Sequence, residues 1–175
     1  LVLGGAGFIG SHLCEGLLGA GHAVRVFARA GTDRRNVAHL ERRVEWRQGD
    51  FLDRADIQDA PAGIDVVFHL ISTTRPEGSN ENSTYDIATN LISTLHLLDA
   101  CRDQSIRKLV FLSSGGTVYG VPRDTPMTED HPTDPICSHG IHKLAIEKYL
   151  FLHHRLYGLD YTVLRLSNPY GERQD

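Results

Sequence analysis

The sequence predicts a doubly wound α/β domain, in which helices cover both faces of a parallel β-sheet. Short runs rich in Val, Leu, Ile and Phe alternate along the chain with segments of helical periodicity, the pattern of strand–helix–strand units. The apolar runs are continuous instead of alternating with polar residues, as strands buried on both faces require. With 41% hydrophobic and 23% charged residues, the 175-residue chain has the composition of one compact domain over residues 1–175.

Each expected strand is an apolar run bounded by turn residues, and each expected helix is a periodic segment between two such runs. The strands are, in order, "LVL", "AVRVFA", "VEWRQGD", "DVVFHLI", "KLVFLSS" and "YTVLRLS". Helices are expected over 8–19, 53–59, 85–103 and 138–157, and a polar loop follows the second strand. Residues 73–84 and 120–137 are long irregular stretches, and loops of such length are commonly functional. Both ends look cut, so we expect a fragment of a longer protein.

Composition argues against several classes of partner. The formal charge is −4 and no block of Lys or Arg stands out, so we expect no nucleic-acid partner. No apolar run approaches the roughly 20 residues of a membrane-spanning helix, so we expect no membrane segment. Cys14, Cys101 and Cys137 are widely spaced and form no CxxC motif, which disfavours a disulfide or a zinc site and indicates the reducing cytoplasm.

The opening stretch "LVLGGAGFIGSHL" has the order strand, glycine turn, helix. Gly4, Gly7 and Gly10 are spaced by three residues, and a GxGxxG pattern is also present. An early glycine lets the backbone turn sharply, Gly7 lets a pyrophosphate approach it, and Gly10 lets the helix pack against its strand. The helix start at Phe8 and Ile9 offers unpaired N–H donors to phosphate. These features predict a Rossmann-type dinucleotide site; the alternative is a mere tight turn.

The end of the second strand bears on the choice of dinucleotide. An acid about 20 residues after the glycines commonly binds the ribose 2′-OH, but "VRVFARAGTDRR" has Ala28 there, followed by Arg29. An arginine can pair with a 2′-phosphate, and Arg34 and Arg35 lie nearby. A solvated basic loop is an equal alternative. The sequence therefore leaves NAD and NADP both open.

Several further stretches follow the glycine loop in a fixed order. "GDFLD" comes after the third strand, "HLIS" ends the fourth, "SSGGTVYG" ends the fifth, and "HGIHK" opens a helix. Together with "RLSNPYG", this series resembles the extended short-chain dehydrogenase/reductase family, in particular its NAD-dependent epimerase/dehydratase group, which acts on nucleotide sugars. The resemblance covers essentially the whole chain. It implies NAD as cofactor, a nucleotide-sugar substrate and a substrate-binding C-terminal part that this chain lacks.

The resemblance also assigns residues to the two ligands. In the family the Asp of "GD" contacts the adenine, the loop after the fourth strand lines the adenosine, and the segment after the sixth strand faces substrate and nicotinamide. The implied cofactor residues, besides the glycine loop and Arg29, are Asp50, Phe51, Leu70, Ile71, Ser72, Asn90, Ser113, Lys143 and Pro169. The implied substrate residue is Asn168.

The family's catalytic group is a Ser or Thr, a Tyr and a Lys, the last two spaced as YxxxK on one helical face. The Lys charge lowers the pKa of the phenol, so that the Tyr exchanges protons near neutrality. Registering "VYG" and Lys143 on this pattern places Gly115 at the Ser/Thr position and His139 at the Tyr position. No YxxxK occurs anywhere in the chain. Ser114 and Thr117 are the hydroxyls that best replace the missing one.

His139 has two interpretations. A neutral imidazole, with an ordinary pKa near 6.5, can act as a base, although it is shorter than tyrosine and Lys143 opposes its protonation. The alternative, which the sequence favours, is a solvated and inactive residue at the start of a helix. A metal site with His142 lacks a third ligand and is not expected, and Cys137 is expected to be inert. We therefore expect weak or absent catalysis.

The resemblance favours epimerisation, by transient oxidation of a sugar hydroxyl and its reduction on the other face. Related 4,6-dehydratases carry an Asp-Glu pair directly after the Ser/Thr, where this chain has Gly116 and Thr117. That departure disfavours a dehydratase and leaves a simple dehydrogenase or reductase open. The competing hypothesis is a non-catalytic dinucleotide-binding module or redox sensor, and the missing Tyr is its main support.

The expected helices 85–103 and 138–157 carry apolar residues over a wide arc. In the family the matching helices pair across a two-fold axis into a four-helix bundle, so a homodimer is expected. The residues assigned to this contact are Leu91, Leu95, Leu98, Leu144, Ile146 and Leu150. The alternative is that these side chains only cover the sheet.

Overall fold

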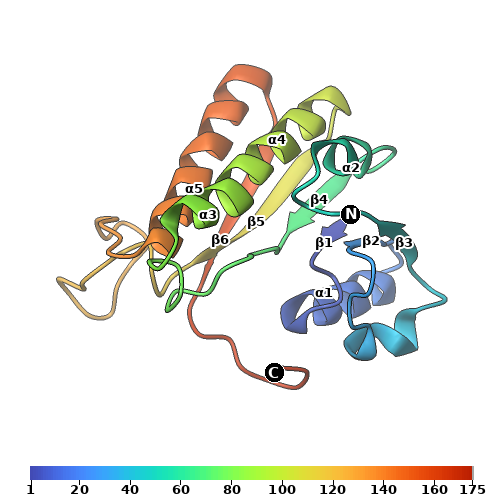
Figure 1. The fold of residues 1–175 in the computed structure, drawn as a ribbon, viewed down its shortest axis with the longest axis horizontal. Helices are drawn as coiled ribbons and strands as arrows, with labels where there is room; N and C mark the ends of the chain where they lie inside the picture. Colours follow the sequence, from blue (N-terminus) through green and yellow to red (C-terminus); the bar gives the residue numbers. More distant parts are fainter. Residues whose placement is uncertain (175) are drawn as a thin grey trace.

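Six parallel strands form one sheet in the order β3-β2-β1-β4-β5-β6 (Figure 1). The structure, a computed structural model, describes residues 1–174. The strand order reverses direction at β1, from which the chain first builds outward to β3 and then crosses over to β4. The doubly wound parallel fold expected from the sequence is therefore confirmed. In such sheets ligands bind at the carboxyl ends of the strands where the order reverses, here between β1 and β4.

Each strand and helix expected from the sequence is present. The strands are β1 (Val2–Leu3), β2 (Arg25–Ala28), β3 (Glu45–Gln48), β4 (Val66–His69), β5 (Lys108–Ser114) and β6 (Asp160–Leu166). The helices are α1 (Phe8–Gly19), α2 (Arg54–Asp59), α3 (Ser83–Asp86), α4 (Ser93–Asp103) and α5 (Ser138–Tyr157). A 3₁₀-helix covers Arg35–Leu40, and a π-helical turn, Ile87–Ile92, joins α3 to α4.

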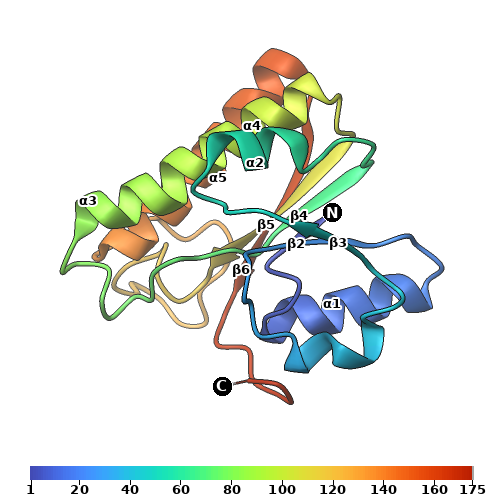
Figure 2. The ribbon, with the colours of Figure 1, turned by 45° about the vertical axis from the view of Figure 1, so that its right-hand side comes forward.

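Helices cover both faces of the sheet. Figure 2 shows α1 and the 3₁₀-helix on one side, and α2, α3, α4 and α5 on the other. Along the buried strands, successive side chains enter opposite layers. Val2 and Val26 belong to the core cluster under α1, whereas Leu3 and Phe27 belong to the larger cluster under α2, α4 and α5. This two-sided burial explains why β1 and the middle of β2 are apolar, whereas the edge strand β3 is mostly polar and exposed.

Two segments differ from the sequence-based expectation. The polar loop after β2 contains the 3₁₀-helix, because Val37 and Leu40, three residues apart, are buried in the cluster under α1. The single helix expected over 85–103 is continuous but contains the π-helical turn, where the Thr89 hydroxyl donates to the Tyr85 carbonyl oxygen at 2.8 Å. Turns of this kind occur frequently at functional sites.

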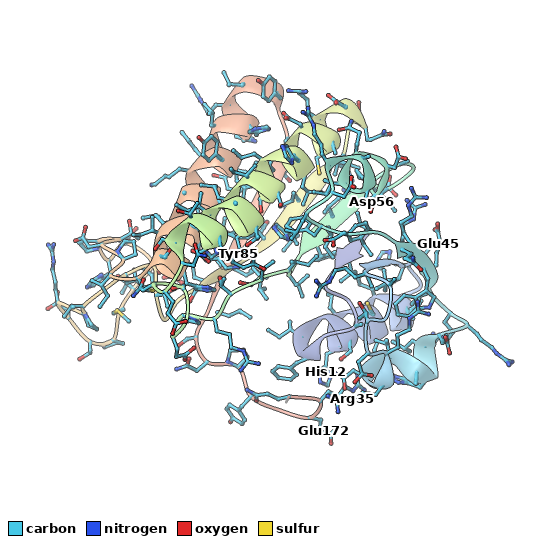
Figure 3. All side chains as sticks on the ribbon, viewed as in Figure 1. His12, Arg35, Glu45, Asp56, Tyr85 and Glu172 are labelled. Carbon is cyan, nitrogen blue, oxygen red and sulfur yellow. The ribbon has the colours of Figure 1, made fainter. Side chains whose placement is uncertain are left out.

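The segment after β6 returns to the first helix. His12 Nε2 lies 3.0 Å from the Glu172 carbonyl oxygen, and Figure 3 labels both residues, His12 on α1 and Glu172 in the segment after β6. Arg173 forms an ion pair with Glu15 of α1 at 2.8 Å. These contacts lead the chain along the carboxyl ends of the strands, where the expected ligands bind.

Two further observations concern the expectations drawn from composition. The three cysteines are free thiols, and burial raises the pKa of Cys14 to about 11 and that of Cys101 to about 12, so both stay protonated. Within residues 1–174, every helix is too short or too polar to cross a bilayer.

Candidate active site

The turn between β1 and α1 is shaped by its glycines. Gly4 has φ +85°, a conformation that favours glycine, and its carbonyl oxygen accepts a hydrogen bond from Gly7 N at 3.1 Å. A Cβ at Gly10 would lie 2.1 Å from the same carbonyl oxygen, so a side chain there would push α1 away. A Cβ at the exposed Gly7 would meet only that oxygen, at 3.4 Å, and would stand in open space. The turn therefore fits a pyrophosphate at the N-terminus of α1.

A cavity of about 400 Å³ opens beside this turn. The expected cofactor residues that line it are Gly4, Gly7, Arg29, Asp50, Phe51, Leu70, Ile71 and Ser72. Thr32, Thr73 and Tyr85, which the sequence did not single out, also line it. Asp50 is held in place because its Oδ1 accepts a hydrogen bond from Leu52 N at 2.9 Å. This cavity has the position of an adenosine site at the reversal of strand order.

The end of β2 carries no acid in this cavity. Ala28 and the exposed Arg29 line the wall where a carboxylate would bind the ribose. Arg34 is engaged elsewhere, with its guanidinium carbon 4.1 Å from the centre of the Trp46 ring. Arg35 forms an ion pair with the Asp two residues before it. Of the three arginines that follow β2, Arg29 is the one that lines the cavity.

A second cavity, of about 430 Å³, adjoins the first, and both are lined by Leu70 and Ser72. The other expected residues that line it are Ile9, Ser113, Ser114, Thr117, His139, Lys143, Asn168 and Pro169. Asn168 has φ +42°, a left-handed conformation that asparagine adopts more readily than most residues. The residues expected to hold the cofactor and those expected to act on the substrate thus face two adjoining cavities.

Phe8, Gly10 and Asn90 were expected at the cofactor but line neither cavity. The Asn90 amide is buried: Oδ1 accepts from Thr73 N at 2.9 Å, and Nδ2 donates to the Asp86 carbonyl oxygen at 3.0 Å. These bonds fasten the loop after β4 to the helix. Asn90 therefore holds the cavity wall from behind.

Ser113 is expected at the cofactor, but its hydroxyl is already bonded within the protein. The Ser113 Oγ donates to Glu147 Oε1 at 2.5 Å, and Glu147 is also paired with Arg165 at 2.7 Å. The sequence did not single out Glu147 or Arg165, because no local pattern marks two residues that meet across α5 and β6. This network joins α5 to the sheet. Because the Ser113 hydroxyl already donates to Glu147, other hydroxyls have to bind the substrate.

Thr117 and Ser114 are the hydroxyls that remain for the substrate. Thr117 Oγ1 is buried and has no hydrogen-bond partner among the described residues, and Ser114 lines the same cavity. Gly115 faces elsewhere, since a Cβ there would lie 3.0 Å from a carbonyl oxygen of β6. Both hydroxyls named from the sequence are therefore placed to hydrogen-bond a ligand.

His139 is buried, with 7% of its surface exposed, so the expectation of a solvated residue is wrong. The loop over 73–84 covers the start of α5. Asn80 Oδ1 accepts from Ser138 N at 2.8 Å, and Ser79 Oγ accepts from His139 N at 3.1 Å. The His139 side chain thereby faces the second cavity.

The charge states of His139 and Lys143 follow from this burial. Burial lowers the pKa of His139 to about 4, and the charge of Lys143 adds to the effect, so the imidazole is neutral at pH 7. His139 Nδ1 is buried without a hydrogen-bond partner among the described residues. Lys143 Nζ donates to the Leu112 carbonyl oxygen at 2.9 Å, and burial lowers its pKa to about 8. An ammonium thus stands beside a neutral imidazole at the cavity wall.

Comparison with known proteins agrees with this geometry. Residues 1–175 match the model of the NAD dependent epimerase/dehydratase family. A UDP-glucose 4-epimerase of Mycolicibacterium smegmatis is 36% identical over 180 residues, which cover 100% of this chain and 57% of the relative. The chain therefore spans little more than half of that protein.

Solved structures give the same picture. The UDP-glucose 4-epimerase of Thermus thermophilus in complex with NAD matches with a TM-score of 0.89 and 37% identity, over 99% of this chain and 56% of that one. The UDP-glucose 4-epimerase of Thermotoga maritima with UDP-glucose matches with a TM-score of 0.90 and 35% identity, over 99% and 57%.

Proposed function

Because the chain belongs to the NAD-dependent epimerase/dehydratase family, we propose that it is the dinucleotide-binding part of an enzyme that epimerises nucleotide sugars. The observation that carries the proposal is the pair of adjoining cavities. One lies beside the glycine turn, and the other is lined by His139, Lys143, Ser114 and Thr117. Solved relatives were crystallised with NAD and with UDP-glucose, which supports NAD as the cofactor and a nucleotide sugar as the substrate.

In the proposed reaction the cofactor carries the hydride and the protein carries the proton. A nicotinamide bound in the second cavity would supply the hydride chemistry, and Ile9 and Pro169 line the wall against which it would lie. Ser114 and Thr117 hydrogen-bond the sugar hydroxyl, and His139 Nε2 accepts its proton. The same nitrogen returns the proton after the sugar has presented its other face, which inverts the carbon centre.

Lys143 is proposed to hydrogen-bond the ribose of the nicotinamide. Its bond to the Leu112 carbonyl oxygen occupies one of three ammonium donors, so the group retains donors for a ligand. The same positive charge disfavours a protonated imidazole at His139. We therefore propose that His139 is a weaker base than the tyrosine of the family.

Two competing functions would need other residues in the second cavity than an epimerase needs. Within the described residues, no Asp or Glu lines the second cavity, and Gly116 and Thr117 stand where a dehydratase carries its acids. This supports epimerisation over dehydration. The other competitor is a cytoplasmic dinucleotide-binding module without catalysis, and the unpartnered polar atoms of Thr117 and His139 at the second cavity argue against it.

The test uses the full-length protein that contains this chain. Interconversion of UDP-glucose and UDP-galactose is measured with NAD present, and dinucleotide affinity is measured by calorimetry. We expect micromolar-range binding and slow epimerisation. Binding of NAD without sugar turnover, in the wild type and in His139→Tyr alike, would favour the non-catalytic module. Absence of dinucleotide binding would refute the proposal altogether.

The choice of dinucleotide leads to a separate prediction. Ala28→Asp should tighten NAD binding by roughly tenfold, about 1.4 kcal/mol, because a carboxylate at the end of β2 accepts hydrogen bonds from the ribose. The same carboxylate should weaken NADP binding by repelling the 2′-phosphate. Calorimetric titration of both dinucleotides measures the change, with Arg29→Ala as a companion that should weaken NADP alone. An unchanged NAD affinity in the Asp variant would mean that the ribose is bound elsewhere.

The helix faces assigned to a dimer contact need correction. All six assigned residues are buried or half-buried, namely Leu91, Leu95, Leu98, Leu144, Ile146 and Leu150. Leu98, Ile146 and Leu150 are part of the core cluster, so the sheet covers them. The outward faces of the same helical segments carry other apolar side chains, each at least 37% exposed: Ile92, Ile141, Tyr149, Leu152 and Leu156.

We propose that the protein forms a homodimer through this outward apolar face. Ile141→Glu combined with Leu152→Glu should convert a dimer into a monomer, because carboxylates that have no positive partner are costly to bury. Light scattering at micromolar concentration measures the mass. Phe151→Glu is the matched control, since this exposed side chain lines a different cavity beside β6. A monomeric wild type would reject the dimer.

A further inference from the structure

A buried carboxylate lies against the first turns of α5. Asp86, the last residue of α3, has no exposed surface. Its Oδ2 accepts hydrogen bonds from the Ser138 hydroxyl at 2.6 Å and from His142 Nδ1 at 2.8 Å. Its Oδ1 accepts from the Thr74 hydroxyl and from Asn90 Nδ2 at 3.1 Å. Burial by itself raises the pKa of this carboxyl, but the hydrogen bonds hold it below the ordinary value, so the group is ionised.

This carboxylate orients the ring of His142. Nδ1 must carry a hydrogen to bond a carboxylate, so the neutral ring has its lone pair at Nε2. Burial lowers the pKa of His142 in spite of the opposing effect of Asp86, and the ring is neutral at pH 7. Nε2 is buried and has no hydrogen-bond partner within residues 1–174. A buried acceptor without a donor is costly unless something binds it.

The ring of His142 is in contact with that of His139. The two centroids are 4.9 Å apart, and the ring planes meet at 69°. His139 contributes a buried Nδ1 and His142 a buried Nε2, both without partners in the described chain. For His139 to take a proton at Nε2, its Nδ1 must already carry one. That buried N–H then needs an acceptor, and the ring beside it offers a free lone pair.

We propose that His142, held by Asp86, is the positioning residue that makes His139 a base. When the ligands bind, a small rotation lets His139 Nδ1–H donate to His142 Nε2, and His139 Nε2 then faces the sugar hydroxyl. This inference rests on the proposed epimerase function. In this arrangement a buried acceptor fixes the distal nitrogen of the base, His139. His142 is that acceptor and lies between the base and the carboxylate of Asp86.

The proton transfer balances without any further reactant. In the oxidation step the sugar O–H bond breaks and an N–H bond forms at His139 Nε2. The C–H bond of the carbon that bears this oxygen also breaks, a C=O bond forms, and the hydride would pass to the dinucleotide. The imidazolium is stabilised through its Nδ1–H bond to His142 and the carboxylate of Asp86. In the reduction step the same proton and hydride return to the sugar, so His139 ends neutral.

A tyrosine at position 139 makes no use of this arrangement. A phenol exchanges its proton at one oxygen and depends on the charge of Lys143 to lower its pKa. An imidazole needs an acceptor at its second nitrogen, and the charge of Lys143 works against its protonated form. The two bases therefore depend on different neighbours. This difference allows the role of His142 to be separated from a general effect on the structure.

The experiment compares His142 variants in two backgrounds of the full-length protein, wild type and His139→Tyr. In the wild-type background, His142→Phe should lower kcat by roughly 10²-fold with KM for UDP-glucose unchanged. His142→Gln should retain more activity, because one amide can both donate to Asp86 and accept from His139. In the tyrosine background both variants should change kcat by less than about threefold. NAD affinity checks that each variant is folded.

His153→Phe is the matched control. His153 lies on the same helix, is 8% exposed and has an Nδ1 without a hydrogen-bond partner among residues 1–174, but it is about three helical turns from His142. It should leave kcat unchanged in both backgrounds. Equal losses from His142→Phe in both backgrounds, or no loss in the wild type, would overturn the inference. If neither background turns over sugar although NAD binds, the proposed function fails and the inference falls with it.

Discussion

Replacing His139 with tyrosine is expected to raise the turnover of the full-length protein by roughly 10²-fold. Burial and the charge of Lys143 hold the pKa of His139 to about 4, so the imidazole is a weak base at pH 7. A phenol reaches further into the cavity, and the same lysine charge that opposes the imidazolium favours the phenolate. The measurement is kcat for interconversion of UDP-glucose and UDP-galactose. Equal rates in the two proteins would show that the histidine does not limit catalysis.

The pH dependence of the two proteins should also differ. In the proposed mechanism the neutral imidazole of His139 is the base, and this form is lost only as the pH falls through its lowered pKa. The wild-type rate should therefore persist from pH 7 down to about pH 4. On acidification the tyrosine variant should lose activity first, because a phenol becomes protonated at a higher pH than this imidazole. NAD affinity should be the same in both, since Lys143 and the glycine turn are untouched.

Replacing Gly7 with valine is expected to weaken NAD binding by roughly 100-fold or more, about 2.7 kcal/mol. Gly7 has φ −76° and ψ −179°, an extended conformation that valine adopts without strain. Its Cβ would meet only the Gly4 carbonyl oxygen, at 3.4 Å, so the fold has room for the side chain. The space that the side chain fills is the one that a pyrophosphate needs at the N-terminus of α1. Calorimetry measures the affinity.

Two further glycines on α1 serve as controls. Gly16→Val places its side chain where no atom lies within 4 Å, so it should leave NAD affinity unchanged. Gly10→Val should instead destabilise the fold, because its Cβ would lie 2.1 Å from the Gly4 carbonyl oxygen. Thermal denaturation separates this loss of stability from the loss of affinity in Gly7→Val. An unchanged NAD affinity in Gly7→Val would contradict the assignment of the turn as the pyrophosphate site.

The fold could be predicted because its causes are local in the sequence. Strands buried on both faces require continuous apolar runs, and the chain has such runs at β1, β4 and β5, whereas the edge strand β3 is mostly polar and exposed. A turn that brings a helix against its own strand requires glycine, and Gly10 has no room for a Cβ. The helical spacing of four residues likewise places His139 and Lys143 on one face of α5, and both line the same cavity.

The environment of His139 could not be predicted, since it depends on residues far away in the chain. The loop that buries it contributes Ser79, 60 positions earlier, and the carboxylate behind it is Asp86, which bonds a histidine 56 positions later. Polar side chains carry no periodic pattern that marks such pairs. Without these partners the sequence favoured a solvated, inactive histidine, and the structure instead buries it against His142.

The buried faces of α4 and α5 likewise could not be predicted from the sequence. The helix α5 carries apolar residues on more than one side, and the sequence by itself determines only that both helices pack on a sheet. It does not decide which apolar side is buried, because the choice is made by the sheet against which each helix packs. Leu98 and Ile146 lie against that sheet, whereas Leu152 remains 42% exposed. Burial is a property of the assembled layers, and only the tertiary structure decides it.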